Sequence, residues 1–252
     1  MASPVFTRHS NFKAQNSGRD GLIPSAYDGP LMTVENTLQK TVITFVVLLV
    51  AAGLGWFLPV LLLPGIAVGF ILGLVNSFKK EPSPPLIISY AVAEGLAIGA
   101  LSGIMERVES GIVSQAVIGT LCVVGLVLLL FKSGKVRATP KLTKIFIIAT
   151  LGYALFSVVN LILQVTGVVT DPWGLRSSVM IPYTSIPLGI ALGIIAIVLA
   201  SYSLVIDFTF IDEGSKKGLP ERYGWTAAFG ITVTIVWLYV EILRLISLAN
   251  RR

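Results

Sequence analysis

Four ionisable residues stand inside otherwise apolar stretches of this chain. They are Glu94, Asp207, Glu241 and Arg244. A charge in an apolar medium is costly, so such residues usually face a protein interior or a water-filled cavity. Carboxylate oxygens bind hard cations such as Ca²⁺, and a carboxyl group withdrawn from water is a candidate proton sensor. These residues therefore predict cation or proton handling.

Each of these residues also has a purely structural interpretation. Glu241 and Arg244 are three positions apart, so on one helix they could neutralise each other as ion and counter-ion. Asp207 stands about one turn from the end of its apolar run, where water could hydrate it. Glu94 stands deepest in its run, and the hydroxyl of Tyr90, one turn earlier, could donate a hydrogen bond to it. The residues alone leave these alternatives open.

The chain has few of the residues that enzymes most often use for catalysis. The only histidine is His9, in the polar N-terminal part, and the only cysteine is Cys122, in an apolar run. Their isolation removes serine–histidine and cysteine–histidine catalysis and any multi-histidine metal centre. No aspartyl-protease motif is present either. We therefore expect neither an enzyme nor a bound cofactor.

The elements that must position the four residues are membrane helices. Of the 252 residues, 54% are hydrophobic and 13% are charged, and the mean hydropathy is +0.85. These values lie outside the range of soluble domains, so the lipid bilayer is the expected surrounding medium. The net charge of +6 comes from short clusters between apolar runs. Because these clusters form no basic face or tail, nucleic-acid binding is not expected.

Seven apolar stretches are long enough to cross a bilayer as helices, which takes about 20 residues each. We predict an all-α integral membrane protein, a seven-transmembrane-helix bundle at residues 40–248, between a polar cytoplasmic tail at 1–39 and a short tail at 249–252. The predicted spans are Thr41–Leu58, Val60–Phe78, Pro85–Met105, Ile112–Phe131, Ile145–Thr166, Ser185–Ile211 and Trp225–Leu248.

The basic residues predict the orientation in the membrane. With seven spans, 14 lysines and arginines fall on the side of the N-terminus and 5 on the other side. Cytoplasmic loops are enriched in these residues, so the N-terminus is predicted to be cytoplasmic. A cleavable signal peptide is not expected, and the first span would direct the chain to the membrane. If the last span re-enters without crossing, Arg251 and Arg252 also fall on the cytoplasmic side.

Glycines recur at every fourth position in three of the predicted spans. This spacing lets helix backbones approach closely, so these glycines are expected to pack the bundle and not to line a pathway. The series are Gly65, Gly69 and Gly73; Gly95, Gly99 and Gly103; and Gly189 with Gly193.

Three segments resemble the Bax inhibitor family, in its bacterial branch of the YccA type. FKKEPSPPLIISYAVAEGLAIGALS, at residues 78–102, is similar to the loop and third span of that family. SLVIDFTFI, at 203–211, is similar to its span-six aspartate motif, and WLYVEILRLI, at 237–246, to its last-span acidic motif. The three stand in the family's order on the matching predicted spans.

The resemblance implies a pH-sensitive Ca²⁺ leak channel or a Ca²⁺/H⁺ exchanger of the inner membrane. The acidic pair that gates it, senses protons and could bind Ca²⁺ would be Asp207 and Glu241, and Glu94 would line the same pathway. The alternative is a regulator that moves no ion and binds a membrane protease or another membrane partner. These buried acids favour transport, because a scaffold has little need of a carboxylate in the membrane core.

The chain also departs from the family's pattern. Glu241 stands where the family usually has aspartate, and Arg244 adds a cation that could act as a counter-ion and weaken the pH response. Helix rise places Asp207 about 12 Å to the inside and Glu241 about 6 Å to the outside of their span midpoints. The expectation that this pair meets therefore rests on the resemblance.

Overall fold

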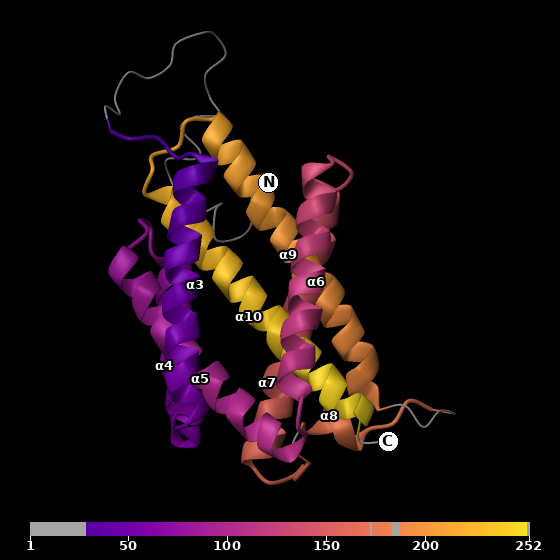
Figure 1. Cartoon of the computed structure of the whole chain (residues 1–252). Helices are drawn as coiled ribbons and strands as arrows, with labels where there is room; N and C mark the ends of the chain where they lie inside the picture. Colours follow the sequence, from indigo (N-terminus) through magenta and orange to yellow (C-terminus); the bar gives the residue numbers. More distant parts are fainter. Residues whose placement is uncertain (1–28, 172, 183–186, 251–252) are drawn as a thin grey trace. The chain divides into compact units, whose positions relative to one another are not determined.

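The computed structural model describes residues 29–171, 173–182 and 187–250, and most of these are helical. Within this part, seven helices are long and apolar enough to cross a membrane. The predicted all-α, seven-span architecture is therefore confirmed. The elements in chain order are α3 (Val34–Trp56), the 3₁₀ turn η1 (Pro59–Leu61), α4 (Leu62–Phe78), α5 (Pro84–Val108), α6 (Ile112–Lys132), α7 (Pro140–Val165), the short α8 (Leu175–Ser178), α9 (Leu188–Lys216) and α10 (Tyr223–Asn250) (Figure 1).

Some predicted features lie outside the described residues. They are residues 1–28 of the polar tail, which include His9, the start of the sixth span at Ser185, and the terminal Arg251 and Arg252. Each of the seven predicted spans otherwise coincides with one long helix, and the differences are at the helix ends.

The first helix begins at Val34, ahead of the expected Thr41, because the residues before it form a cap. The Thr33 hydroxyl accepts a hydrogen bond from the Asn36 amide, and the Asn36 side chain accepts one from the Thr33 amide. This reciprocal arrangement satisfies amides that the start of a helix leaves unpaired. Residues 34–39 of the predicted tail are therefore helical.

The sixth span runs past the expected Ile211 and ends at Lys216. Its last turns carry Asp212 and Glu213, which pair with Lys216 at 2.9 Å and with Lys217 at 2.7 Å. Pairs four positions apart lie on one helix face and stabilise an exposed helix by roughly 0.2–0.5 kcal/mol each. The helix therefore continues as a polar segment beyond the apolar stretch that predicted it.

The chain divides into two compact units. The first contains residues up to Ile104 together with 206–233, and the second contains 105–205 together with the residues from Thr234 onward. The long helices α9 and α10 therefore contribute a part to each unit.

In the first unit, glycines bring α3, α4 and α5 into close contact (Figure 1). Gly95 and Gly99 of α5 face the backbone of α3, and a β-carbon at Gly99 would overlap the carbonyl group of Ala52. Gly65 of α4 leaves similar space for Ala97 of α5. The predicted packing role of these glycines is confirmed.

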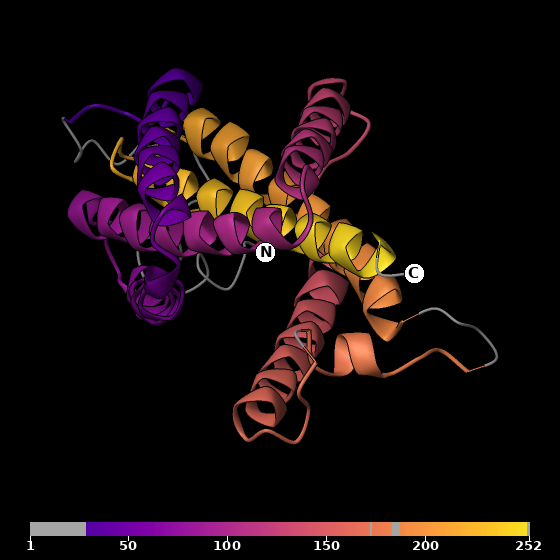
Figure 2. The same ribbon diagram turned by 60° about the horizontal axis from the view of Figure 1, so that its bottom comes forward.

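In the second unit, α10 packs on α9 and α6, and the short α8 lies beside α7 (Figure 2). Gly189 and Gly193 of α9 make room for Leu248 and Leu245 of α10. By contrast, only 6% of the most apolar window of α7 is buried. In a bilayer, lipid covers an outward-facing apolar surface of this kind.

We predict that Gly99→Ala destabilises the protein, because the added β-carbon meets the backbone of α3 and not a side chain that could move aside. Overpacking of this kind costs about 1–3 kcal/mol. The measurement is the Tm of the purified protein in detergent. Gly53→Ala is the matched control, because nothing lies within 4 Å of a β-carbon at that position. Equal Tm values for the two variants would contradict this packing account.

Candidate functional site

The four predicted site residues lie on three helices. Glu94 is on α5 and Asp207 is on α9, both within the first unit. Glu241 and Arg244 are on α10, within the second unit. Each residue is described with the neighbours of its own unit, and the pairing of Asp207 with Glu241 stays a prediction.

The carboxylate of Glu94 lies against α4, opposite Gly69. A β-carbon at Gly69 would be 2.5 Å from Oε2 of Glu94. One turn earlier, Tyr90 is buried, and its ring meets the ring of Phe229 edge to face with 5.0 Å between the centroids. Gly69 belongs to a predicted packing series, and here its missing side chain makes room for a carboxylate.

Asp207 lies against α10, opposite Gly230, and is 7% exposed. A β-carbon at Gly230 would be 2.8 Å from Oδ1 of Asp207. Gly230 is absent from the predicted glycine series, and its only signal in the sequence is that it is a glycine within an apolar span. Both predicted site carboxylates of the first unit, Glu94 and Asp207, therefore face a glycine on a neighbouring helix.

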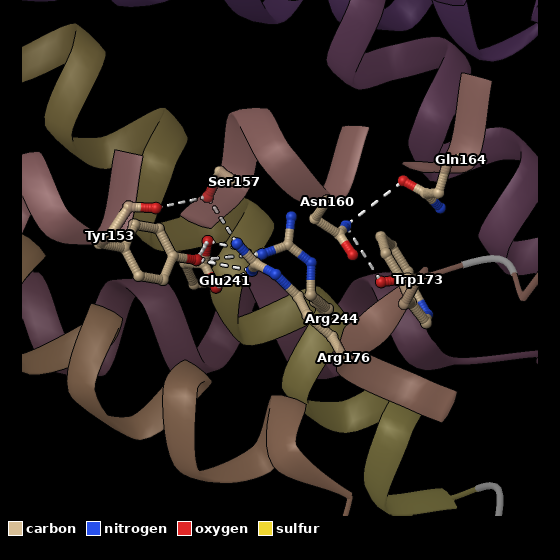
Figure 3. A network of polar contacts seen from close by, with 8 residues as sticks. All are labelled: Tyr153, Ser157, Asn160, Gln164, Trp173, Arg176, Glu241 and Arg244. Carbon is tan, nitrogen blue, oxygen red and sulfur yellow. Dashed lines mark hydrogen bonds and ion pairs between the residues drawn. The ribbon is translucent and has the colours of Figure 1, made fainter. Parts of the chain in front are cut away.

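Glu241 is 2% exposed, and its carboxylate contacts groups from α7, α8 and α10 (Figure 3). Arg244 of α10 approaches Oε1 at 2.7 Å, and the Tyr153 hydroxyl of α7 donates a hydrogen bond to the same oxygen. Arg176 of α8 reaches Oε2 at 3.5 Å. One buried carboxylate therefore meets two guanidinium groups.

Arg176 is one of the site residues that the sequence did not predict, together with Tyr153 and Ser157. By position it is a loop cation, yet its side chain is only 5% exposed. Its guanidinium donates to the Tyr153 hydroxyl at 2.6 Å and to the Ser157 hydroxyl at 2.7 Å. It also lies over the rings of Tyr153 and Phe156, at 4.9 and 5.5 Å from their centroids. The one available signal was Trp173, a large aromatic residue just before it in the loop.

Side chains of α7 and α10 fix the loop that carries Arg176 (Figure 3). Asn160 of α7 accepts a hydrogen bond from the first amide of α8 at 2.7 Å and donates to the Trp173 carbonyl at 3.3 Å. The Trp173 indole donates to the Ser247 hydroxyl of α10 at 3.2 Å, and its ring faces the guanidinium of Arg244 at 5.2 Å. The loop is therefore held from both sides.

The cluster around Glu241 contains one more positive group than negative groups, because both Arg176 and Arg244 contact a single carboxylate. Nε of Arg244 is buried and has no hydrogen-bond partner among the described residues. Within the same residues, no group of three or more His, Cys, Asp or Glu could hold a metal ion. Any cation bound at Glu241 would therefore have to use hydroxyl oxygens or water as well.

We predict that Tyr153→Phe destabilises the protein by about 1–3 kcal/mol, because it removes the hydroxyl that links Glu241 to Arg176 and leaves buried partners unsatisfied. Thermal unfolding in detergent measures the loss. Tyr202→Phe is the matched control, since the Tyr202 hydroxyl contacts only Thr139 and Thr143 near the start of α7 and no charged group in the described residues. A Tm for Tyr153→Phe as high as that of the control would rule out a stabilising cluster.

Comparison with known proteins assigns the family. A search of curated proteins returned no match for this chain. A model of the family described as Bax inhibitor 1 like matches residues 3–251, a range that includes all seven membrane helices and the cluster around Glu241. The chain therefore belongs to the Bax inhibitor 1 like family, whose members it resembles over nearly its whole length.

Proposed function

We propose that the chain is a pH-sensitive Ca²⁺ leak channel or Ca²⁺/H⁺ exchanger that uses carboxylates within its membrane helices. One observation carries this proposal: Asp207 and Glu241 are buried and Glu94 is half-buried, on helices whose expected surroundings are lipid. Charged groups in such places are costly, and they mark ion and proton pathways.

Glu94 and Asp207 are proposed as carboxylate ligands that bind the ion along its pathway. Each faces a glycine, so no side chain projects toward the carboxylate from Gly69 or from Gly230. Hard cations such as Ca²⁺ prefer oxygen ligands of this kind. A proton competes with the cation for the same oxygens, which couples ion binding to pH.

Glu241 is proposed as the gate. Its carboxylate contacts Arg176 and Arg244, and through Arg176 it holds the loop with α8. When a charge pair holds an element in place, binding of a proton or a cation to the pair can release that element. Arg244 then acts as the counter-ion of the gate.

The proposed location is the inner membrane of a bacterial cell, with the N-terminus in the cytoplasm. The support for this orientation is the excess of lysine and arginine on one side of the predicted spans, 14 against 5. In this orientation the loop with Arg176 lies on the outer side of the membrane.

The test of the transport proposal is Ca²⁺ entry into proteoliposomes that contain a Ca²⁺-sensitive dye, measured from about pH 5 to about pH 8. Asp207→Asn and Glu94→Gln are expected to lower the flux severalfold, because each removes a charged ligand. Their flux should also change less with pH than the wild-type flux, since neither amide binds a proton. A pH-sensitive dye in the lumen separates the two mechanisms, because only an exchanger couples Ca²⁺ entry to proton exit.

Asp212→Asn and Glu213→Gln are the matched controls, because they make the same chemical changes at lysine-paired carboxylates near the end of α9. Both should retain the wild-type flux. If folded wild-type protein gives no flux above that of empty liposomes, the transport proposal is wrong, and a regulator that binds a membrane protease or another membrane partner becomes the better account.

A further inference from the structure

The loop between α6 and α7, with the helix ends beside it, carries a dense group of positive charges. No aspartate or glutamate occurs from residue 110 to residue 170. None of the four lysines in the group forms an ion pair with a carboxylate of the described residues. The group consists of five exposed residues: Lys132, Lys135, Arg137, Lys141 and Lys144.

The lysines at the end of α9 differ from this group, although both segments fall on the same side of the predicted seven-span arrangement. Lys216 lies 2.9 Å from Asp212, and Lys217 lies 2.7 Å from Glu213. Basic residues orient a membrane protein whether or not acidic residues stand beside them. Orientation therefore explains the lysines of the α6–α7 loop but not the absence of acidic residues around them.

The start of α7 joins two of these lysines to an apolar surface. Lys141, Lys144, Ile145 and Ile148 are spaced so that they share one face of the helix. Ile145 is 55% exposed and Ile148 is 63% exposed. In a bilayer such side chains contact acyl chains, and lysines at the end of the apolar face reach the level of the lipid headgroups.

Contacts within the second unit hold both ends of the loop. The Tyr202 hydroxyl of α9 accepts a hydrogen bond from the Thr139 amide at 3.3 Å and lies 3.2 Å from the Thr143 hydroxyl. On the α6 side, the guanidinium of Arg137 lies over the ring of Phe131, 4.1 Å from its centroid. The positive groups are therefore attached to a backbone that is fixed at the end of α6 and at the start of α7.

We propose that the α6–α7 loop is a binding surface for anionic phospholipids. Lys141 and Lys144 contact the phosphate of the lipid, whose acyl chains lie along Ile145 and Ile148. Helix rise separates the two lysines by about 4.5 Å along the axis, so both ammonium groups can reach one headgroup. Ammonium groups donate charge-assisted hydrogen bonds to phosphate oxygens, and the other basic residues of the loop add attraction to an anionic membrane surface.

The apolar face decides between a lipid and a soluble partner. An acidic protein or a nucleic acid could contact the basic residues, but it would leave Ile145 and Ile148 uncovered. A lipid molecule contains both a negative headgroup and apolar chains, in the order in which α7 presents its lysines and isoleucines. The proposal is independent of Ca²⁺ transport, because it concerns a surface that contains none of the membrane carboxylates.

The test measures which lipids lie beside the start of α7. A fluorophore is attached to Leu142→Cys, at an exposed position, after the native thiol has been removed by Cys122→Ser. The protein is placed in bilayers that contain either phosphatidylglycerol or phosphatidylcholine with a quenching nitroxide on the acyl chain. At equal mole fractions, we expect phosphatidylglycerol to quench the fluorophore severalfold more than phosphatidylcholine does.

A probe at the other end of the same helix is the control for position. Val165→Cys is 78% exposed in the native chain's geometry and has no basic residue near it in the sequence until Arg176. There the two lipids should quench equally. At Leu142→Cys, raising the salt concentration from about 0.1 M to about 1 M should reduce the preference, because the Debye length falls from about 10 Å to about 3 Å.

Two double variants separate a specific surface from general charge attraction. The preference should disappear in Lys141→Gln/Lys144→Gln and persist in Lys216→Gln/Lys217→Gln, although each pair of substitutions lowers the net charge from +6 to +4, that is 6 − 2. Lys141→Arg/Lys144→Arg keeps both charges and should retain the preference.

Three results would overturn the proposal. They are equal quenching by the two lipids at Leu142→Cys, an equally large preference at Val165→Cys, and a preference that survives Lys141→Gln/Lys144→Gln. The first two come from proteins with every native lysine in place, so they do not depend on the folding of a charge variant. Equal quenching at Leu142→Cys would leave a soluble acidic partner as the better account of the basic loop.

Discussion

A single buried anion, the carboxylate of Glu241, organises the chemistry of the second unit. Lipid offers no solvation to a charge, so a buried carboxylate on a membrane helix depends on partners within the protein. The chain supplies Arg244 from the same helix, Tyr153 from α7 and Arg176 from the loop between α7 and α9. The position of that loop on the two helices follows from this requirement, and so does the proposed gate.

The carboxylates of Glu94 and Asp207 in the first unit share a different feature. Glu94 and Asp207 face glycines on neighbouring helices, which leave space beside the carboxylate where another residue would place a side chain. The glycines that bring α3, α4 and α5 together thus serve close packing and, at Gly69, the placement of an acidic group. A helix can pack closely against these carboxylates because glycine has no β-carbon to collide with them.

Much of the fold could be predicted from the sequence because membrane helices obey a simple length rule. A run of about 20 apolar residues gives a span, and seven such runs gave the seven helices. Helix ends were less predictable, since they depend on local bonds such as the cap at Thr33 and the ion pairs near Lys216. Apolarity carries no information about those bonds.

At the candidate site, the sequence could predict only contacts between residues that are close together on one helix. The contact between Glu241 and Arg244 follows from their spacing of three on one helix. Arg176 could not be found in this way, because its partners Tyr153 and Ser157 come from another helix and the path of the loop is set by tertiary contacts. Gly230 was missed for a similar reason, since its partner Asp207 lies on a different helix.

If Arg176 and Glu241 stabilise the protein as a pair, the effects of removing each are coupled, and a double-mutant cycle measures that coupling. The unfolding free energies of the wild type, Arg176→Gln, Glu241→Gln and the double variant would be measured in one detergent. The account predicts that the second substitution costs less once the first is present, with a coupling of about 1–3 kcal/mol. Losses that add to within about 0.5 kcal/mol would contradict it, because residues that do not interact behave in that way.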